Sequence, residues 1–144
     1  MTICILGNSL TALTLAKALA NQNIYVDVLY YKKNLHINKT STIGISKSNT
    51  DYFEKNIIKV NKLLWKLKKI EIFSDNLERE RLINFENDKE QLLSIIKSQE
   101  IYQLLDNDLS KNTFFKSKLI TIKNLSFIDK YSLIIGCDSS NAVA

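Results

Sequence analysis

Three small residues near the start of the chain have the spacing of a phosphate-binding turn. Gly7, Ser9 and Ala12 occupy the glycine positions of the pattern G-x-G-x-x-G/A, in which the backbone approaches a pyrophosphate closely. Gly7 can form the tight turn, and Ala12 is small enough for a helix to pack closely on a strand. Ser9 departs from the pattern but adds a hydroxyl, which can cap a helix or contact a phosphate. The spacing predicts a phosphate site; a strand–helix pair without any ligand is the alternative interpretation.

The elements around this turn are those of a βαβ unit, which we predict over residues 1–31. Apolar residues 3–6 predict a buried strand, an alanine- and leucine-rich stretch predicts a helix to about Asn21, and residues 25–30 predict a second strand. Because the turn begins a helix, backbone N–H groups without intrahelical partners point at whatever binds there. The pyrophosphate of a dinucleotide is the ligand that this geometry favours. The backbone groups predicted to approach it are those of Gly7, Asn8, Ser9, Leu10 and Thr11.

The remaining pattern predicts shorter helices and strands. Residues 131–135 predict a last buried strand, which ends at Gly136 and a run of small polar residues, much as the first strand ends at Gly7. Ligands of an open α/β sheet collect at the carboxyl ends of its strands, so these two ends are expected to flank one site. In between, we expect a polar loop over 31–42, a helix over 51–56 capped by Ser48 or Asn49, a helical or turn segment around Trp65, strands over 70–73, 82–85 and 114–122, and a helix over 99–109.

The composition argues against several classes of function. The net charge is +5, but 18 of the 20 basic residues are lysines in a chain also rich in Asn and Ile, and we predict no nucleic-acid partner. Cys4 and Cys137 lie on predicted buried strands as reduced thiols and, with the single histidine His36, lack the spacing of a metal site. Since no apolar run approaches about 18 residues, we predict no transmembrane helix and expect a cytoplasmic protein.

Together these residues resemble the N-terminal part of FAD-dependent aromatic hydroxylases, in particular the ubiquinone-biosynthesis hydroxylases. The resemblance implies an α/β protein with a Rossmann-like FAD-binding βαβ fold, inserted antiparallel strands and a truncated domain. Residues 1–144 would be a partial FAD-binding domain, in which 1–31 is the βαβ unit, 32–130 includes part of the substrate side, and 131–144 is the last strand with a D-G-like turn. Four stretches carry the likeness: 5–12 with Leu15, Ala16 and Leu19; 43–53 with Leu64 and Trp65; 95–101 with Leu104 and Leu105; and 136–141.

The resemblance also implies roles for residues outside the first turn. Tyr30, Tyr31 and Lys32 would lie beside the adenosine half of FAD, with Tyr30 where the family has a ribose-binding glutamate. Gln99 would lie near the ribityl or flavin region, and Asp138 would orient the turn beside the flavin. Their alternatives are a surface cap or turn residue for Gln99 and a helix cap for Asp138. The family also has an arginine where Ser41 and Gln99 stand, and a glycine where Ser139 stands.

By the same resemblance, the complete enzyme would bind FAD, take hydride from NAD(P)H as co-substrate, react with dioxygen and hydroxylate an aromatic ring in ubiquinone biosynthesis. No catalytic side chain is assigned, because the flavin carries that chemistry. A polyprenylated aromatic substrate would imply peripheral contact with the inner membrane or a multi-enzyme association. The C-terminal portion of the same enzyme would be a further partner, and without it we expect the 144-residue chain not to hydroxylate anything.

Two other functions stay open at this point. One is an NAD-binding oxidoreductase domain, which Tyr30 disfavours because the ribose diol of NAD calls for a carboxylate acceptor. The other is a catalytically silent Rossmann-like interaction module that binds a partner through an uncovered sheet edge.

Overall fold

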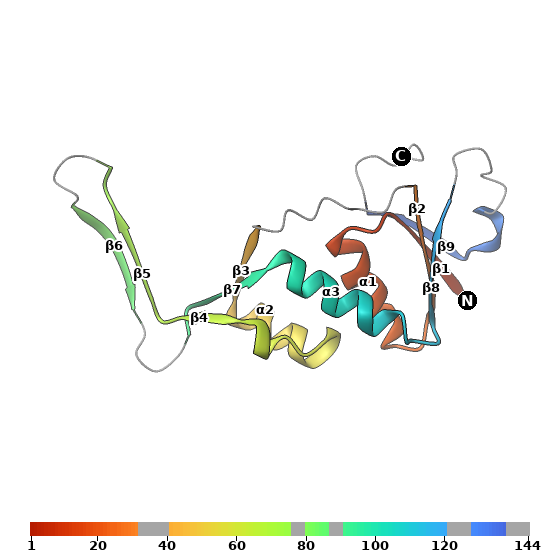
Figure 1. The fold of residues 1–144 in the computed structure, drawn as a ribbon, viewed down its shortest axis with the longest axis horizontal. Helices are drawn as coiled ribbons and strands as arrows, with labels where there is room; N and C mark the ends of the chain where they lie inside the picture. The colour runs from red at the N-terminus through yellow and green to blue at the C-terminus, as the bar shows by residue number, and fades with distance from the viewer. Residues whose placement is uncertain (32–40, 76–79, 87–90, 121–127, 138–144) are drawn as a thin grey trace.

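A computed structural model describes residues 1–31, 41–75, 80–86, 91–120 and 128–137 of the chain (Figure 1). Lys32, Asp138, Ser139 and His36 lie outside the described residues. The strands are β1 (Thr2–Leu6), β2 (Tyr25–Tyr30), β3 (Thr42–Ser46), β4 (Trp65–Leu67), β5 (Lys69–Phe73), β6 (Arg81–Glu86), β7 (Leu93–Lys97), β8 (Phe115–Leu119) and β9 (Leu133–Gly136). The helices are α1 (Leu10–Ala20), α2 (Lys47–Tyr52) and α3 (Ser98–Leu109), with a π-helical turn Phe53–Ile57 and 3-10 turns Asn61–Leu63 and Ile128–Lys130.

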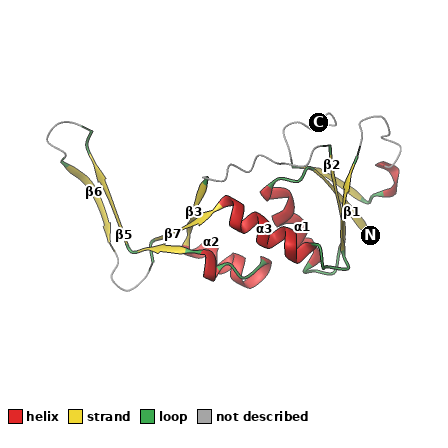
Figure 2. Ribbon diagram, viewed as in Figure 1, coloured by secondary structure: helices red, strands yellow, loops and turns green. Residues whose placement is uncertain are grey.

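The main sheet is parallel and has the strand order β8-β2-β1-β9. Helices α1 and α3 lie on one of its faces (Figure 2). Alternate residues of a strand point to opposite faces, and Ile5 and Val28 are fully buried on the helix side. This confirms the predicted α/β fold with its opening βαβ unit.

Helix α3 packs against α1 through a stripe at helical spacing. Ile101, Leu105 and Leu109 of α3 are buried in the same cluster as the small residues of α1, whose short side chains permit close approach. At one end of this contact the Nζ atom of Lys17 lies 2.6 Å from the Asp108 carboxylate. The two helices thus pack as one layer on the sheet.

The inserted strands are antiparallel, as the resemblance implied. Strands β3, β7 and β4 form one sheet, in the order β3-β7-β4. Strands β5 and β6 form a separate pair, which extends away from the helices at the left of Figure 1. Every residue of β6 is exposed.

Two predictions between the sheets were right only in part: residues 51–56 are helical, and Leu63 ends a 3-10 turn, but the rest of each segment differs. Trp65 lies in a strand and not in a helical or turn segment, because it pairs with Ile95, a partner thirty positions away that no local pattern reveals. The helix expected over 51–56 begins earlier, at Lys47, because the Ser46 hydroxyl caps it by accepting from the Asn49 N–H at 3.3 Å. A π-helical turn then completes the segment.

The last strand is also less buried than predicted. Strand β9 lies at an edge of the described sheet, pairs with β1 alone among the described strands, and leaves Leu133 exposed. Cys137, which follows it, is only half-buried, whereas Cys4 in the middle of the sheet is fully buried. Neither cysteine forms a disulfide within the described part of the chain. Strand β8 lies within the strand expected over 114–122, of which residues 121 and 122 lie outside the described residues. Of the loop expected over 31–42, residues 32–40 lie outside the described residues, and residue 42 begins β3.

Candidate nucleotide-binding site

Residues 7–11, here termed the β1–α1 bend, join the first strand to the first helix. Gly7 has a φ of 114°, a conformation that favours glycine because a Cβ would clash there. Its N–H donates to the Leu29 carbonyl at 2.8 Å, which fixes the bend at the carboxyl ends of β1 and β2. The glycine that the sequence pattern picked out is thus the one whose backbone makes the turn.

Ser9 is the N-cap of α1. Its hydroxyl oxygen accepts from the Ala12 N–H at 3.2 Å, and its carbonyl accepts from the Leu13 N–H at 3.0 Å. The same hydroxyl donates to the Cys137 carbonyl at 3.5 Å. Ser9 therefore caps the helix as predicted and also ties the bend to the end of β9.

The two strand ends that the sequence predicted to flank one site lie side by side. Leu6 is in register with Gly136, and the Cys137 N–H donates to the Leu6 carbonyl at 2.9 Å. Because both strands run in the same direction, their carboxyl ends open at the same edge of the sheet.

The start of α1 offers hydrogen-bond donors at this edge. Among the described residues, the backbone N–H groups of Leu10 and Thr11 have no acceptor, as expected for the first turn of a helix. Thr11 is exposed and Leu10 half-buried, and the first turn holds no acidic residue. With the helix dipole added, this arrangement favours an anion such as a phosphate over a cation. Asn8 is buried at the base of the bend.

Tyr30 and Tyr31 lie at the end of β2, beside the bend, and both are half-buried. The Tyr30 carbonyl accepts from the Ile120 N–H at 2.9 Å, so the end of β8 is tied to the same edge. Tyr30 and Tyr31 therefore lie at the sheet edge where β1, β2 and β8 end. The adenosine half of a dinucleotide was predicted at this edge.

Gln99 is the second residue of α3, in the part of the chain where the antiparallel sheet meets the helices. Within the described residues no hydrogen bond or ion pair joins it to the bend. Its neighbour Ser98 donates from its N–H to the Ser41 carbonyl at 3.0 Å, and the two serine hydroxyls lie 2.7 Å apart. The Ser41–Ser98 contact was not predicted, although the resemblance had marked positions 41 and 99 together as arginine positions of the family.

Among the described residues, Cys4 and Tyr131 have shifted pKa values and lie on the sheet face away from α1 and α3. Away from this sheet, a hydrogen bond from Arg81 lowers the pKa of Glu71 in the β5–β6 hairpin. Burial, followed by the nearby Asp27 charge, raises the pKa of the Cys4 thiol to about 11. Burial, followed by a hydrogen bond to Asp27, raises the pKa of the Tyr131 hydroxyl. Neither group belongs to the β1–α1 bend, which is predicted to bind a pyrophosphate through its backbone N–H groups.

The described part of the chain offers neither a metal site nor a membrane-spanning helix. It contains no group of three His, Cys, Asp or Glu side chains that could hold a metal ion. None of its helices is both long and apolar enough to cross a membrane.

Solved structures share this fold. The chain superimposes on p-nitrophenol 4-monooxygenase PnpA from Pseudomonas putida with a TM-score of 0.65 at 9% identity, over 82% of this chain and 32% of that one. On pqsL, a probable FAD-dependent monooxygenase from Pseudomonas aeruginosa, the TM-score is 0.66 at 13% identity, over 83% of this chain and 32% of that one. On 2,6-dihydroxypyridine-3-hydroxylase from Arthrobacter nicotinovorans, the TM-score is 0.57 at 20% identity, over 81% of this chain and 28% of that one.

These likenesses define the fold class, a mixed α/β fold shared with FAD-dependent monooxygenases. The chain spans about a third of the length of the solved proteins that it matches. No family model matches the sequence, and no curated protein sequence matches it either. Neither an NAD-binding domain nor a silent interaction module is favoured by the structures to which the chain is similar.

Proposed function

We propose that this chain is the FAD-binding portion of a flavoprotein monooxygenase that hydroxylates an aromatic ring. The observation that carries the proposal is the β1–α1 bend, where Gly7 makes a positive-φ turn and two helical N–H groups lack acceptors among the described residues. The shared fold with FAD-dependent monooxygenases supports the choice of FAD as the dinucleotide.

The residues present fit the pyrophosphate of FAD. Gly7 lets the backbone come close, while the N–H groups of Leu10 and Thr11 are the donors that would bind phosphate oxygens. Tyr30 and Tyr31 would lie beside the adenosine, with Lys32 after them. Gln99 would lie toward the ribityl chain or flavin, and Asp138 would orient the turn after β9.

FAD, when bound, supplies the redox chemistry that activates dioxygen, while the protein supplies placement and exclusion of water. NAD(P)H as the hydride donor and a ubiquinone precursor as the ring are finer proposals, which rest on the sequence resemblance alone. A polyprenylated ring would place the enzyme at the periphery of the inner membrane. We further propose that a C-terminal portion completes the substrate side, so that the 144-residue chain alone does not hydroxylate.

The test is a calorimetric titration of the chain with FAD, using a matched pair of variants at Thr11. Thr11→Glu places a carboxylate where the pyrophosphate would bind, yet an acidic residue in the first turn suits the helix dipole and should keep the fold. We expect this variant to bind FAD at least about tenfold more weakly than the wild type. Thr11→Gln has the same shape without the charge and should bind within about twofold of the wild type.

ADP should compete with FAD for the wild-type chain, since the bend binds the diphosphate and not the flavin ring. Circular dichroism of each variant controls for folding. Equal FAD affinity of the Glu and Gln variants, or no saturable binding by the wild type, would contradict the proposal.

A further inference from the structure

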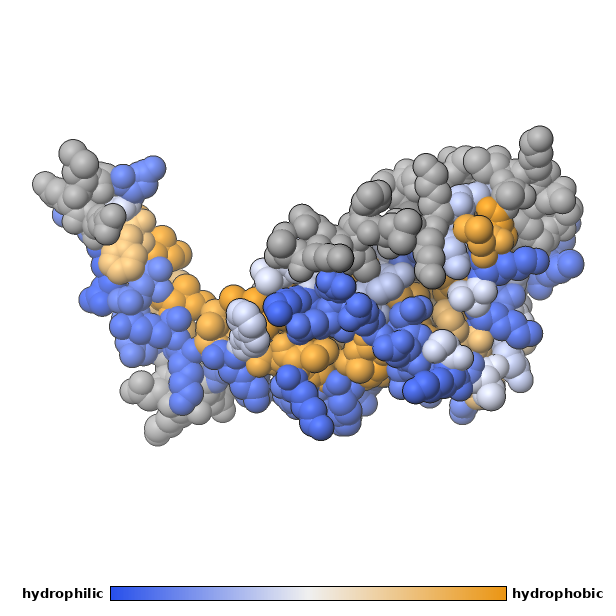
Figure 3. Space-filling view, viewed as in Figure 1, coloured by the Kyte–Doolittle hydropathy of each residue, from blue (hydrophilic) through white to orange (hydrophobic). Residues whose placement is uncertain are grey.

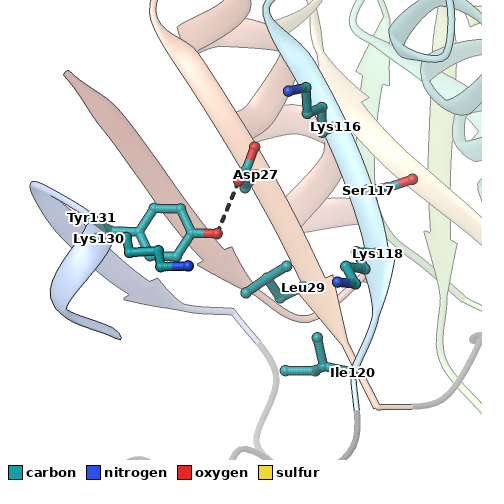
Figure 4. Close-up of a pocket in the computed structure, with 8 residues that line it drawn as sticks. All are labelled: Asp27, Leu29, Lys116, Ser117, Lys118, Ile120, Lys130 and Tyr131. Carbon is teal, nitrogen blue, oxygen red and sulfur yellow. Dashed lines mark hydrogen bonds between the residues drawn. The ribbon is translucent and has the colours of Figure 1, made fainter. Parts of the chain in front are cut away.

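A cavity of about 510 Å³ lies on the face of the main sheet opposite α1 and α3 (Figure 4). Its walls come from β2, from β8 with the residue after it, and from the 3-10 turn before β9. The volume is within the range of about 300–1,000 Å³ that is usual for small-molecule sites. None of its described lining residues is among those predicted to hold the dinucleotide.

The floor of the cavity is apolar. Leu29 is buried with Cys4 and Leu6 in a small cluster on this face, and Ile120 and Tyr131 pack against the same cluster. Leu29 and Ile120 lie on the floor beside the ring of Tyr131 (Figure 4). Ile120 and Tyr131 are only half-buried, so a flat apolar group bound there would remove their exposed parts from water.

The rim of the cavity is positively charged. Lys116, Lys118 and Lys130 line it, and all three are exposed. Lys116 and Lys118 are two residues apart on β8, so both side chains lie on the cavity face of that strand. Within the described part of the chain none of the three forms an ion pair, although Asp27 is in register with Lys116 across β2 and β8.

The one acidic residue of the lining already has a partner. The Tyr131 hydroxyl donates to the Asp27 carboxylate at 2.9 Å (Figure 4). This bond directs the carboxylate toward the tyrosine, and the three ammonium groups outnumber this one carboxylate around the opening.

We propose that this cavity is a second binding site, separate from the dinucleotide edge, for a small organic anion whose phosphate or carboxylate is attached to a flat apolar body. The anion is held by Lys116, Lys118 and Lys130, and the apolar body lies on Leu29 and Ile120. The site uses the sheet face that the helices leave open.

Phenyl phosphate is the probe, titrated into the 144-residue chain by calorimetry at fixed ionic strength. Lys116→Gln with Lys118→Gln removes two rim charges and should weaken binding by about tenfold. The control is Lys55→Gln with Lys62→Gln, which removes the same charge from exposed positions outside the cavity and should leave affinity unchanged. All four lysines are exposed, so the fold should be retained.

Inorganic phosphate and benzyl alcohol separate the two parts of the site. We expect each to bind more weakly than phenyl phosphate, because one lacks the apolar body and the other the charge. No binding of phenyl phosphate, or an equal loss in the two double variants, would overturn the proposal. Inorganic phosphate binding as tightly as phenyl phosphate would overturn the role of the apolar floor. Added FAD should leave phenyl phosphate affinity unchanged, and competition between the two would overturn the separation of the sites.

Discussion

Ile5 of β1 and Leu82 of β6 are both aliphatic residues in strands that the sequence predicts, but Ile5 is fully buried and Leu82 is 61% exposed. Strand β1 lies between β2 and β9 and under α1, so its helix-side residues are sealed from water. Strand β6 has β5 as its partner and nothing over its faces among the described residues. Orange apolar side chains are accordingly visible along the hairpin in Figure 3.

The comparison shows that a sequence can form a strand without burying that strand in a core. An alternating apolar pattern is enough to form a hairpin, but an isolated two-stranded pair gains little stability in water. The parallel sheet is stable because two helices cover one of its faces, and the β1–α1 bend begins one of these helices. A substitution should therefore have very different effects in the two regions.

Leu105→Ala should have the largest effect. Leu105 is fully buried in the cluster where α3 packs against α1, and its truncation leaves a cavity there. We expect the free energy of unfolding in urea to fall by about 2–5 kcal/mol. Leu104, one position away and half-buried, is the control: Leu104→Ala should cost clearly less. Equal losses at both positions would contradict the packing described for α3.

Gly7→Ala comes next. A Cβ at φ 114° is strained, and we expect a loss of about 1–3 kcal/mol in the free energy of unfolding together with weaker FAD binding. Gly44→Ala is the matched control. A Cβ there would meet the Leu93 side chain at 3.4 Å, an ordinary contact, so the change should be close to neutral or slightly stabilising. If the two glycines tolerate alanine equally, Gly7 does not need its special conformation.

Much of the β1–α1 bend and its flanking strands could be predicted from the sequence because the signals are local. The Gly7 turn, the Ser9 cap and the two flanking strands all depend on residues within about thirty positions, and the structure has each of them. The partnership of β1 with β9 was expected only in outline, from two similar strand ends. That β9 lies at an edge of the described sheet, half-exposed, was not visible in its uniformly apolar sequence.

The early start of α2 depends on the local Ser46 cap, but the other errors fall where long-range contacts decide. Trp65 is in a strand because β7 is available to pair with it, and the sequence around it favours a helix or turn equally well. The Ser41–Ser98 contact joins residues 57 positions apart. The cavity on the open sheet face is formed by β2, β8 and the turn before β9 together, so no local sequence motif predicts it.

Cys4 permits a test of the open sheet face through pH. Its folded-state pKa is raised from 9.0 to about 11, so the folded state keeps its proton where the unfolded state has lost it. The contribution to stability is therefore fully present below pH 9 and is lost as pH rises toward 11, by an amount on the order of 1–2 kcal/mol.

The measurement is the free energy of unfolding of wild type and Cys4→Ala at several pH values. The variant should be less stable at neutral pH but should show a shallower decline between pH 9 and 11. Cys137→Ala, at the half-buried thiol, should keep the wild-type slope. Parallel slopes for wild type and Cys4→Ala would show that the Cys4 thiol is not shielded from water by this face.

Substitutions in the hairpin should have the smallest effect. Leu82 and Phe85 are 61% and 52% exposed, so most of their surface is in water both before and after folding. We expect Leu82→Ser to change the free energy of unfolding by less than about 0.5 kcal/mol, since little burial is lost. A control within the hairpin is Ile70→Ser, at a half-buried residue of β5, which should cost more. If Leu82→Ser lowered the free energy of unfolding as much as Ile70→Ser, the outer face of β6 would be covered in solution. The hairpin would then be buried like the main sheet, and the contrast between the two regions would not hold.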